Sequence, residues 1–129
     1  MDVFSKLKEM KILLIDDDEW IRDSLTMFFK GEGCSCTAVE TAEEGLKAFE
    51  KQIYDIVIVD YRLPGMDGLE FFNRILEPRP HAMKILITAY GNAGVFSEAK
   101  RMGVQDIIEK PLTPEAIELS LSRLIENRM

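Results

Sequence analysis

Side chains that bind soft metals are scarce in this sequence, which has two cysteines and one histidine. A zinc site built from four such ligands needs more of them. Cys34 and Cys36 stand one residue apart in GCSCTAV, a spacing of about 6.6–6.8 Å on a strand and near the outer limit for a disulfide. We therefore expect two ordinary, mostly buried thiols, and we interpret His81, next to Pro80, as a loop residue.

Long apolar runs are absent as well. A membrane helix needs about 20 predominantly apolar residues, and no uncharged stretch approaches that length. The beginning of the chain, MDVFSKLKEMK, carries lysines and acids instead of the apolar segment of a secretory signal. We therefore expect a cytoplasmic protein with no membrane association.

The chain also lacks clusters of lysine and arginine, and its formal net charge is −7. Nucleic acids are bound through basic surfaces, so we expect no direct nucleic-acid partner. Repeats, linkers and low-complexity segments are missing too. A length of 129 residues, with 47% hydrophobic and 30% charged residues, is typical of one globular domain. We expect that domain to cover 1–129, with its core at about 10–126.

What the sequence does contain is an alternation of short apolar runs and helical patterns. The apolar runs lie at 11–15, 34–39, 56–59, 84–87 and 105–108. The runs IVIV and KILI are hydrophobic on both faces, which is typical of parallel strands covered on both sides.

Apolar residues recur at helical spacing between these runs. The stripes are Ile21, Leu25, Phe28 and Phe29; Ala42, Leu46, Phe49 and Ile53; Leu69, Phe72 and Leu76; Val95, Phe96, Ala99 and Met102; and Ile117, Leu121, Leu124 and Ile125. Thr41 and Glu44 form a capping box. Gly31 and Gly103 are expected to end the first and fourth helices, and TPEA at 113–116 is expected to begin the last.

This alternation predicts an α/β fold, an open parallel sheet of five strands with helices on both faces. Ligands of such sheets bind outside the carboxyl ends of the strands. The polar residues expected there are Asp16, Asp17, Asp18, Glu40, Thr41, Asp60, Thr88 and Lys110. Each has an ordinary explanation alone: Asp18 or Glu19, for example, is expected to be a helix N-cap. A cluster of all of them on one sheet edge is much harder to explain in that way.

Crowded carboxylates limit the chemistry of this edge. Two of them about 4 Å apart repel by roughly 4 kcal/mol at an effective dielectric of about 20, and a divalent cation removes the conflict. Oxygen ligands select Mg²⁺ or Mn²⁺. A cation beside a carboxylate, with a hydroxyl group and a lysine nearby, also suits phosphoryl transfer. Asp60 is then the candidate nucleophile that forms an acyl phosphate.

Four motifs resemble, in their order and spacing, the receiver domains of two-component response regulators. They are LLIDDDEWIR, DIVIVDYRLPGMDGLEF, ILITAY and GVQDIIEKPL, and the resemblance covers Lys11 to about Ile125. It implies a flavodoxin-like (βα)5 three-layer sandwich with strand order 2-1-3-4-5. It also implies Mg²⁺ bound by Asp17, Asp60 and the backbone carbonyl of Arg62, with Asp16 acting mainly through water.

The resemblance further implies the roles of the remaining residues. Asp60 would be the phosphoacceptor. Thr88 would hydrogen-bond the phosphoryl group, and Lys110 would pair with one of its oxygens and precede a cis peptide bond to Pro111. Gly65 and Gly68 would give the loop after the acceptor its turn flexibility.

One position departs from the family. Receivers usually carry tyrosine or phenylalanine three residues before the lysine, where this chain has Ile107. Either Tyr90 takes part in switching instead, or Ile107 is strand core and the switch works without an aromatic. We also hypothesise that Arg62 and Tyr90 shield the acyl phosphate and slow autodephosphorylation.

The resemblance implies a signalling switch rather than an enzyme. A sensor histidine kinase or a phosphotransfer protein would donate the phosphoryl group. An output protein or appended domain would then respond through the face made by the fourth helix, the fifth strand and the last helix, and phosphorylation could also produce a homodimer. The alternatives are an interaction module that works without phosphorylation and an aspartate-nucleophile phosphatase. The phosphatase pattern is poorly matched, since Trp20 follows Asp16-x-Asp18 at the position of its hydroxyl or valine.

Overall fold

The computed structural model of the chain describes residues 3–78, 81–89, 91 and 93–128. Its strands are β1 (Lys11–Ile15), β2 (Ser35–Val39), β3 (Ile56–Asp60), β4 (Met83–Thr88) and β5 (Asp106–Glu109). Its helices are α1 (Val3–Leu7), α2 (Glu19–Gly31), α3 (Ala42–Lys51), α4 (Gly68–Ile75), α5 (Ala93–Arg101) and α6 (Pro114–Arg128). The predicted alternation of strands and helices is confirmed.

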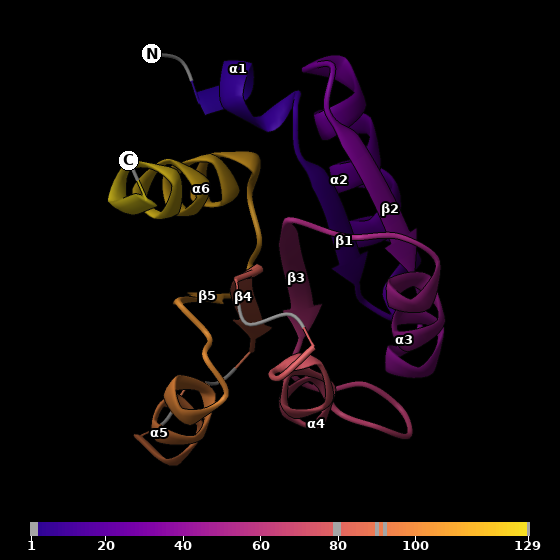
Figure 1. The fold of residues 1–129 in the computed structure, drawn as a ribbon, viewed down its shortest axis with the longest axis vertical. Coiled ribbons are helices and arrows are strands. Elements are labelled where there is room, and N and C mark those ends of the chain that lie inside the picture. The colour runs from indigo at the N-terminus through magenta and orange to yellow at the C-terminus, as the bar shows by residue number, and fades with distance from the viewer. Residues whose placement is uncertain (1–2, 79–80, 90, 92, 129) are drawn as a thin grey trace.

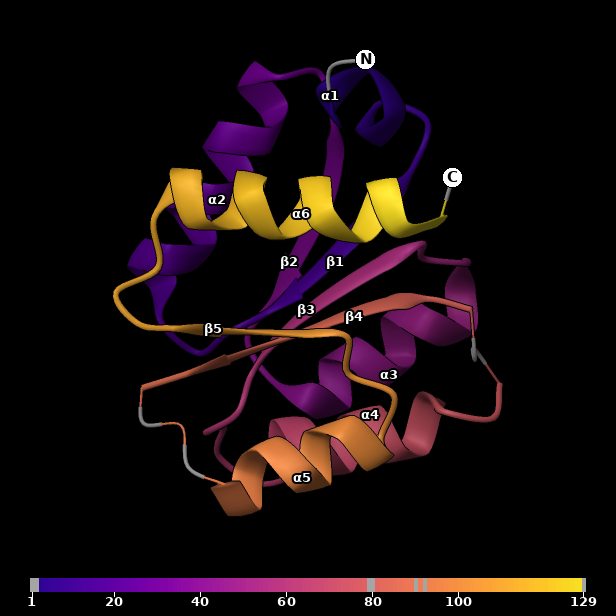
Figure 2. The same ribbon diagram turned by 90° about the vertical axis from the view of Figure 1, so that its left-hand side faces the viewer.

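The strands form one parallel sheet in the order β2-β1-β3-β4-β5. Helices α1, α2 and α6 lie on one face of it, and α3, α4 and α5 lie on the other (Figures 1 and 2). This is the three-layer flavodoxin-like arrangement that the resemblance implies. β1 and β3 lie side by side although 40 residues separate the end of one from the start of the other, so their carboxyl ends meet.

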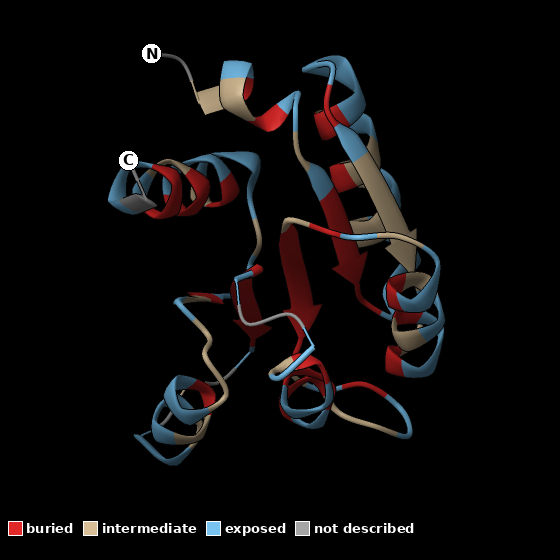
Figure 3. Cartoon of the chain, in the orientation of Figure 1, coloured by how far each residue is buried: buried red, intermediate tan, exposed pale blue. Residues whose placement is uncertain are grey.

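Two apolar cores fill the spaces between the sheet and its helix layers, because successive side chains of a strand point to opposite faces. On β1, Ile12 and Leu14 join the core under α2 and α6, whereas Leu13 and Ile15 join the core under α3 and α4. β3 and β4 are buried along their whole length, as the burial colours of Figure 3 show. The central strands are therefore rigid supports for whatever follows them.

Most predicted helix boundaries are confirmed. Asp18 is the N-cap of α2, and Thr41 caps α3 by accepting a hydrogen bond from the backbone of Glu44. Pro114 begins α6 as predicted. The first predicted helix ends at Gly31, as expected, but Gly31 is not its C-cap. The C-cap is Glu32, and the left-handed backbone that typically ends a helix is found at Gly33, with φ of 77°.

Two predicted core positions are wrong as well. Ile53 lies beyond the end of α3 and is 64% exposed, and Phe96 on α5 is 41% exposed. Conversely, the sequence pattern gave no sign of α1, whose Phe4 and Leu7 are buried against the core. A helix of five residues is too short for a periodicity to be recognised.

The thiols and the histidine lie as expected. Cys34 is buried, Cys36 is half-buried, and both are free. Burial, reinforced by the neighbouring Cys34, raises the pKa of Cys36 to about 12. His81 is exposed in a turn before β4. Of the helices in the described ranges, none combines the length and apolar character that a bilayer crossing requires.

Candidate functional site

Three carboxylates meet where β1 and β3 end. Ile15 of β1 pairs with Val59 of β3, so the next residue of each chain segment, Asp16 and Asp60, reach the same sheet edge. Asp17 completes the group, and oxygen atoms of all three side chains lie within 4.8 Å of one another. The cluster expected from the sequence is therefore formed.

Asp16 lies at the bottom of this cluster with no solvent exposure. Its Oδ1 atom accepts a hydrogen bond from the backbone of Asp18 at 2.9 Å, whereas Oδ2 is buried and has no hydrogen-bond partner among the described residues. Burial raises the pKa of Asp16 to about 6, and the charges of Asp60 and Asp17 add to this rise, whereas the hydrogen bond from Asp18 and the charge of Lys110 oppose it. An orphaned buried carboxylate oxygen is costly, so this position favours a cation or a proton.

Asp60 is the centre of the arrangement. Only 3% of it is exposed, and its Oδ2 atom lies 3.1 Å from Nζ of Lys110. Burial raises the pKa of the Asp60 carboxyl above its usual range, although Lys110 and the backbone N–H of Arg62 both stabilise the charged form. For Lys110, burial lowers the pKa, but the nearby carboxylates outweigh it and the net shift is upward. Lys110 is therefore held as a cation.

Thr88 and Lys110 reach the site from the two strands beyond β3. Thr88 is the last residue of β4 and is 2% exposed. The backbone N–H of Lys110 donates to the carbonyl of Thr88 at 2.9 Å, which places the lysine beside the threonine. The peptide bond between Lys110 and Pro111 is cis, as the resemblance implied.

The donor set of this edge fits a magnesium ion. Carboxylate oxygens dominate it. Within the part of the chain that the structure describes, one of these oxygens is buried without a hydrogen-bond partner, and the cluster includes no sulfur or imidazole ligand. Beside the cluster, Asp17 and Arg62 line a pocket of about 590 Å³ together with the loop after β3. Asp18 is not part of this set, because its carboxylate accepts from the backbone of Trp20 at 2.9 Å and caps α2.

The glycines of the loop after Asp60 have different roles. Gly65 has a left-handed backbone with φ of 77°, the conformational freedom expected of it. Gly68 has no such backbone. It is required instead by close approach, since a Cβ atom there would lie 2.5 Å from the carbonyl oxygen of Asp60. The expected turn flexibility is therefore wrong for Gly68.

Two other positions refine the sequence interpretation. The guanidinium of Arg22, a residue with no predicted role, donates a hydrogen bond to the carbonyl of Asp16 at 2.9 Å. This bond connects α2 to the site. No motif distinguishes Arg22 from an ordinary arginine on a helix. Arg62 is exposed, and Tyr90, its suggested partner in shielding the acyl phosphate, lies outside the described residues.

The comparisons with known proteins agree with this geometry. The response regulator receiver domain family matches residues 12–122. The response regulator protein FleR of Pseudomonas aeruginosa is 35% identical over 83% of this chain, and a cyclic di-GMP phosphodiesterase of Thermotoga maritima is 28% identical over 93% of it. The chain spans only 23% and 32% of these two relatives.

Other relatives have the length of this chain. An uncharacterised 14.6 kDa protein of Leptolyngbya boryana is 34% identical, and the match covers 93% of this chain and 90% of that protein. A CheY-like receiver domain protein of Methanospirillum hungatei has a structure that superposes with a TM-score of 0.82 and is 30% identical, covering 92% of this chain and 98% of that one. The chain thus belongs to the receiver domain family of response regulators.

Proposed function

We propose that this chain is a phosphorylation-dependent signalling switch that accepts a phosphoryl group on Asp60. The observation that carries the proposal is the pairing of a nearly buried Asp60 with Lys110, 3.1 Å away, inside a cluster of two further carboxylates. A structural ion pair would not need Asp16 and Asp17 crowded beside it. A site that receives a phosphoryl group and a metal ion needs all of these groups.

The chain's own residues support each part of the transfer. A carboxylate oxygen of Asp60 attacks phosphorus, the new O–P bond forms, and the bond from phosphorus to the donor's histidine nitrogen breaks with its electrons passing to that nitrogen. Lys110 then stabilises a phosphoryl oxygen in place of the Asp60 charge. The hydroxyl of Thr88 donates a hydrogen bond to another.

Asp17, Asp60 and the carbonyl of Arg62 would hold a magnesium ion, with Asp16 acting through water. When bound, Mg²⁺ supplies positive charge that neutralises the developing negative charge on the phosphoryl oxygens. The buried Oδ2 of Asp16, which none of the described residues contacts by a hydrogen bond, supports this assignment, as do the mutual distances of the carboxylates.

The phosphoryl donor would be a phosphohistidine of a sensor kinase or a phosphotransfer protein, as receivers generally require. The domain would catalyse its own transfer and hydrolysis and would have no turnover of an external substrate. Its acid-rich surface and net charge of −7 make nucleic acid an unsuitable direct partner.

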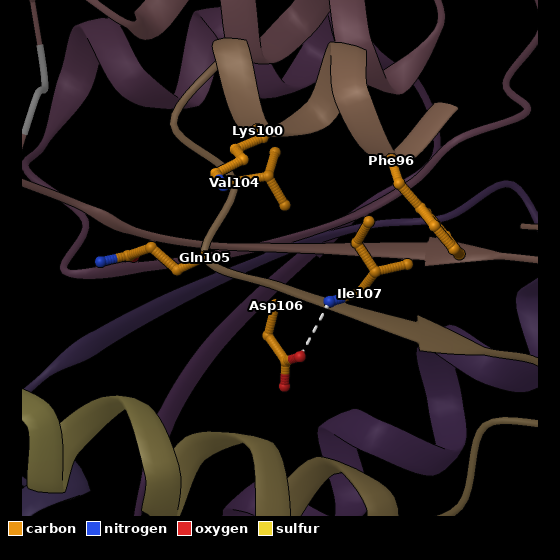
Figure 4. Close-up of a pocket in the computed structure, with 6 residues that line it drawn as sticks. All are labelled: Phe96, Lys100, Val104, Gln105, Asp106 and Ile107. Carbon is orange, nitrogen blue, oxygen red and sulfur yellow. Dashed lines mark hydrogen bonds between the residues drawn. The ribbon is translucent and has the colours of Figure 1, made fainter. Parts of the chain in front are cut away.

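The output surface would be formed by α5, β5 and α6. A groove of about 440 Å³ lies between α5 and β5, and Figure 4 shows Phe96 and Ile107 reaching into it from opposite walls. A Cβ atom on Gly91 would lie 2.4 Å from the ring of Phe96, so this ring touches the loop that follows Thr88. A movement of Thr88 toward a phosphoryl group would therefore disturb the groove, where an output protein, an appended domain or a second copy of the chain would bind.

The test is to incubate the protein with Mg²⁺ and a small phosphoryl donor such as acetyl phosphate or phosphoramidate. Intact-mass measurement should show the gain of one phosphoryl group in the wild type and none in Asp60→Asn. Beryllofluoride offers a second probe, because a structure of the DrrB receiver domain activated by this compound is known. An unlabelled wild type would contradict the proposal, and rapid hydrolysis of phosphomonoesters would favour a phosphatase.

A further inference from the structure

A carboxylate outside the acidic cluster holds the loop that connects β3 to α4. Glu43, in the first turn of α3, accepts a hydrogen bond on Oε2 from the backbone N–H of Met66 at 3.2 Å. The same oxygen would lie 2.9 Å from a Cβ atom on Gly65. Glu43 therefore contacts both residues of the Gly65–Met66 turn, and 23 positions in the sequence separate it from Met66.

The two ends of this loop are fixed in other ways. Tyr61 donates to the carbonyl of Ile87 at 2.8 Å, and Gly68 donates to the carbonyl of Tyr61 at 2.9 Å. Leu63 is buried in the core. The side chain of Met66 packs against the same core. Within the described part of the chain, the bond from Met66 to Glu43 is the one hydrogen bond that joins the turn at 64–66 to another element.

The loop has a direct connection to the candidate site. The backbone N–H of Arg62 stabilises the charged form of the Asp60 carboxylate and so lowers its pKa. The proposed function also assigns the Arg62 carbonyl to the metal. Asp17 and residues 61–65 line one pocket, so a displacement of the turn alters the same surface from which the metal ligands project. Preorganisation of such ligands depends on the groups that hold them.

Neighbouring Glu44 shows that this contact is more than the usual preference for acids at a helix start. Both acids lie in the first turn of α3, where they favour the helix dipole. Glu44 interacts with Thr41 of its own helix cap through its backbone at 3.1 Å and its carboxylate at 3.1 Å. Glu43 instead directs its carboxylate at another element. The dipole explains an acid at position 43, but it does not explain the direction of its side chain.

We propose that Glu43 is a positioning residue for the metal site and for phosphoryl transfer, acting by holding the Gly65–Met66 turn so that the Arg62 carbonyl and N–H stay in place. The proposal rests on the proposed function for the role of Asp60. It adds that the affinity of the site for Mg²⁺ depends on the hydrogen bond that Glu43 of α3 accepts, rather than on the charge of Glu43.

This has a kinetic signature. Removal of the Glu43 carboxylate frees the turn, so the Arg62 carbonyl must be ordered when the metal binds, and the Mg²⁺ affinity falls. Once Mg²⁺ is saturating, that ordering is complete. The phosphorylation rate should then recover, while the Mg²⁺ concentration at half-maximal rate remains high.

The experiment compares Glu43→Ala and Glu43→Gln with the wild type and with Glu50→Ala, a control that removes an exposed acid from the same helix. Calorimetric titration gives the Mg²⁺ dissociation constant. Labelling by acetyl phosphate at varied Mg²⁺ gives the rates. Glu43→Ala should raise the dissociation constant about 3- to 10-fold, as expected for the loss of one hydrogen bond, and saturating Mg²⁺ should restore its rate. Glu43→Gln keeps an acceptor oxygen and, like Glu50→Ala, should stay within about twofold of the wild type.

Two results would overturn the inference. One is a Glu43→Ala protein whose Mg²⁺ affinity equals that of the wild type. The other is a Glu43→Gln protein as weak as Glu43→Ala, since that would assign the effect to charge. A failure of the proposed function would be distinguishable, because the wild type itself would then remain unlabelled by acetyl phosphate. The Mg²⁺ dissociation constants from calorimetry would still test the role of Glu43.

Discussion

Two aspartates at the two ends of β3 have opposite environments. Asp55, just before the strand, is half-buried, and its carboxylate accepts from the backbone of Lys11 at 2.8 Å. Its own backbone joins β1 to β4, through Lys11 and Met83. Asp60, the last residue of the strand, is 3% exposed and shares its space with two more carboxylates.

Asp55 therefore stabilises the fold, whereas the fold holds Asp60 in an environment that is unfavourable for its charged form. The hydrogen-bonding capacity of Asp55 is used by neighbouring strands. At the other end of β3, burial and like charges favour the neutral forms of Asp16 and Asp60. Lys110, 3.1 Å from Asp60, and the backbone N–H of Asp18, 2.9 Å from Asp16, oppose them. Unfavourable crowding of this kind is typical of functional sites.

The largest expected contrast concerns phosphorylation. Asp60→Asn should abolish labelling by acetyl phosphate in Mg²⁺, because the amide is not a nucleophile of the required kind. Asp55→Asn should be labelled like the wild type. Mass spectrometry of the intact proteins measures both, and labelling of Asp60→Asn at the wild-type rate would remove the distinction between the two ends of the strand.

The second contrast concerns pH. The pKa of Asp16 is raised by burial to about 6 in the folded protein, so the folded state binds more protons than the unfolded state between about pH 4 and pH 6. The free energy of unfolding of the metal-free protein should therefore fall as the pH rises through this window. The loss from this residue has an upper bound of about 3 kcal/mol.

Urea unfolding in a chelator at several pH values measures this loss. Asp16→Asn should flatten the curve and be more stable than the wild type at neutral pH, whereas Asp55→Asn should keep the slope. Parallel curves for Asp16→Asn and the wild type would show that the crowding costs little.

Magnesium should offset the loss of stability that the crowded carboxylates cause. An ion that binds only the folded state stabilises it by about 2.7 kcal/mol at 100 times its dissociation constant. The wild type should gain this stability on addition of Mg²⁺. Asp17→Asn should gain much less, and Asp55→Asn should gain as much as the wild type. Thermal unfolding with and without Mg²⁺ provides the measurement, and an equal gain in Asp17→Asn would contradict the assignment of the metal site.

The smallest effect is expected for Asp55, at the start of β3, and it concerns the free energy of unfolding. Asp55→Ala removes the acceptor for the backbone N–H of Lys11 and should destabilise the protein by about 1 kcal/mol. Its rate of phosphorylation should not change. Chemical unfolding gives the first quantity and acetyl phosphate labelling the second. A lost labelling activity in a folded Asp55→Ala protein would mean that the two ends are coupled.

Much of this contrast could be predicted from the sequence. Apolar periodicity located the strands, and parallel topology implied that Asp16, Asp17 and Asp60 would meet. The ends of helices were less accessible. Gly31 and Gly33 are both plausible terminators in KGEG, and only the observed backbone, left-handed at Gly33 alone, distinguishes them.

Contacts between remote segments could not be predicted in this way. The bond from Met66 to Glu43 depends on how far α3 and the loop after β3 approach each other, which no local pattern records. The same holds for Phe96. Its helical spacing favours burial, yet β5 is the edge strand of the sheet and leaves the ring 41% exposed.

The position of α1 has a practical consequence for protein engineering. α1 packs against α6, and since α6 runs back along the sheet from Pro114, its last turn lies beside α1 at the end of the sheet where the strands begin (Figure 2). The acidic cluster lies at the end where the strands finish. A fluorescent protein or affinity tag fused at either terminus would therefore leave the site open. Deleting α1 to shorten the protein, in contrast, would remove the buried side chains of Phe4 and Leu7 and expose the part of the core that they cover.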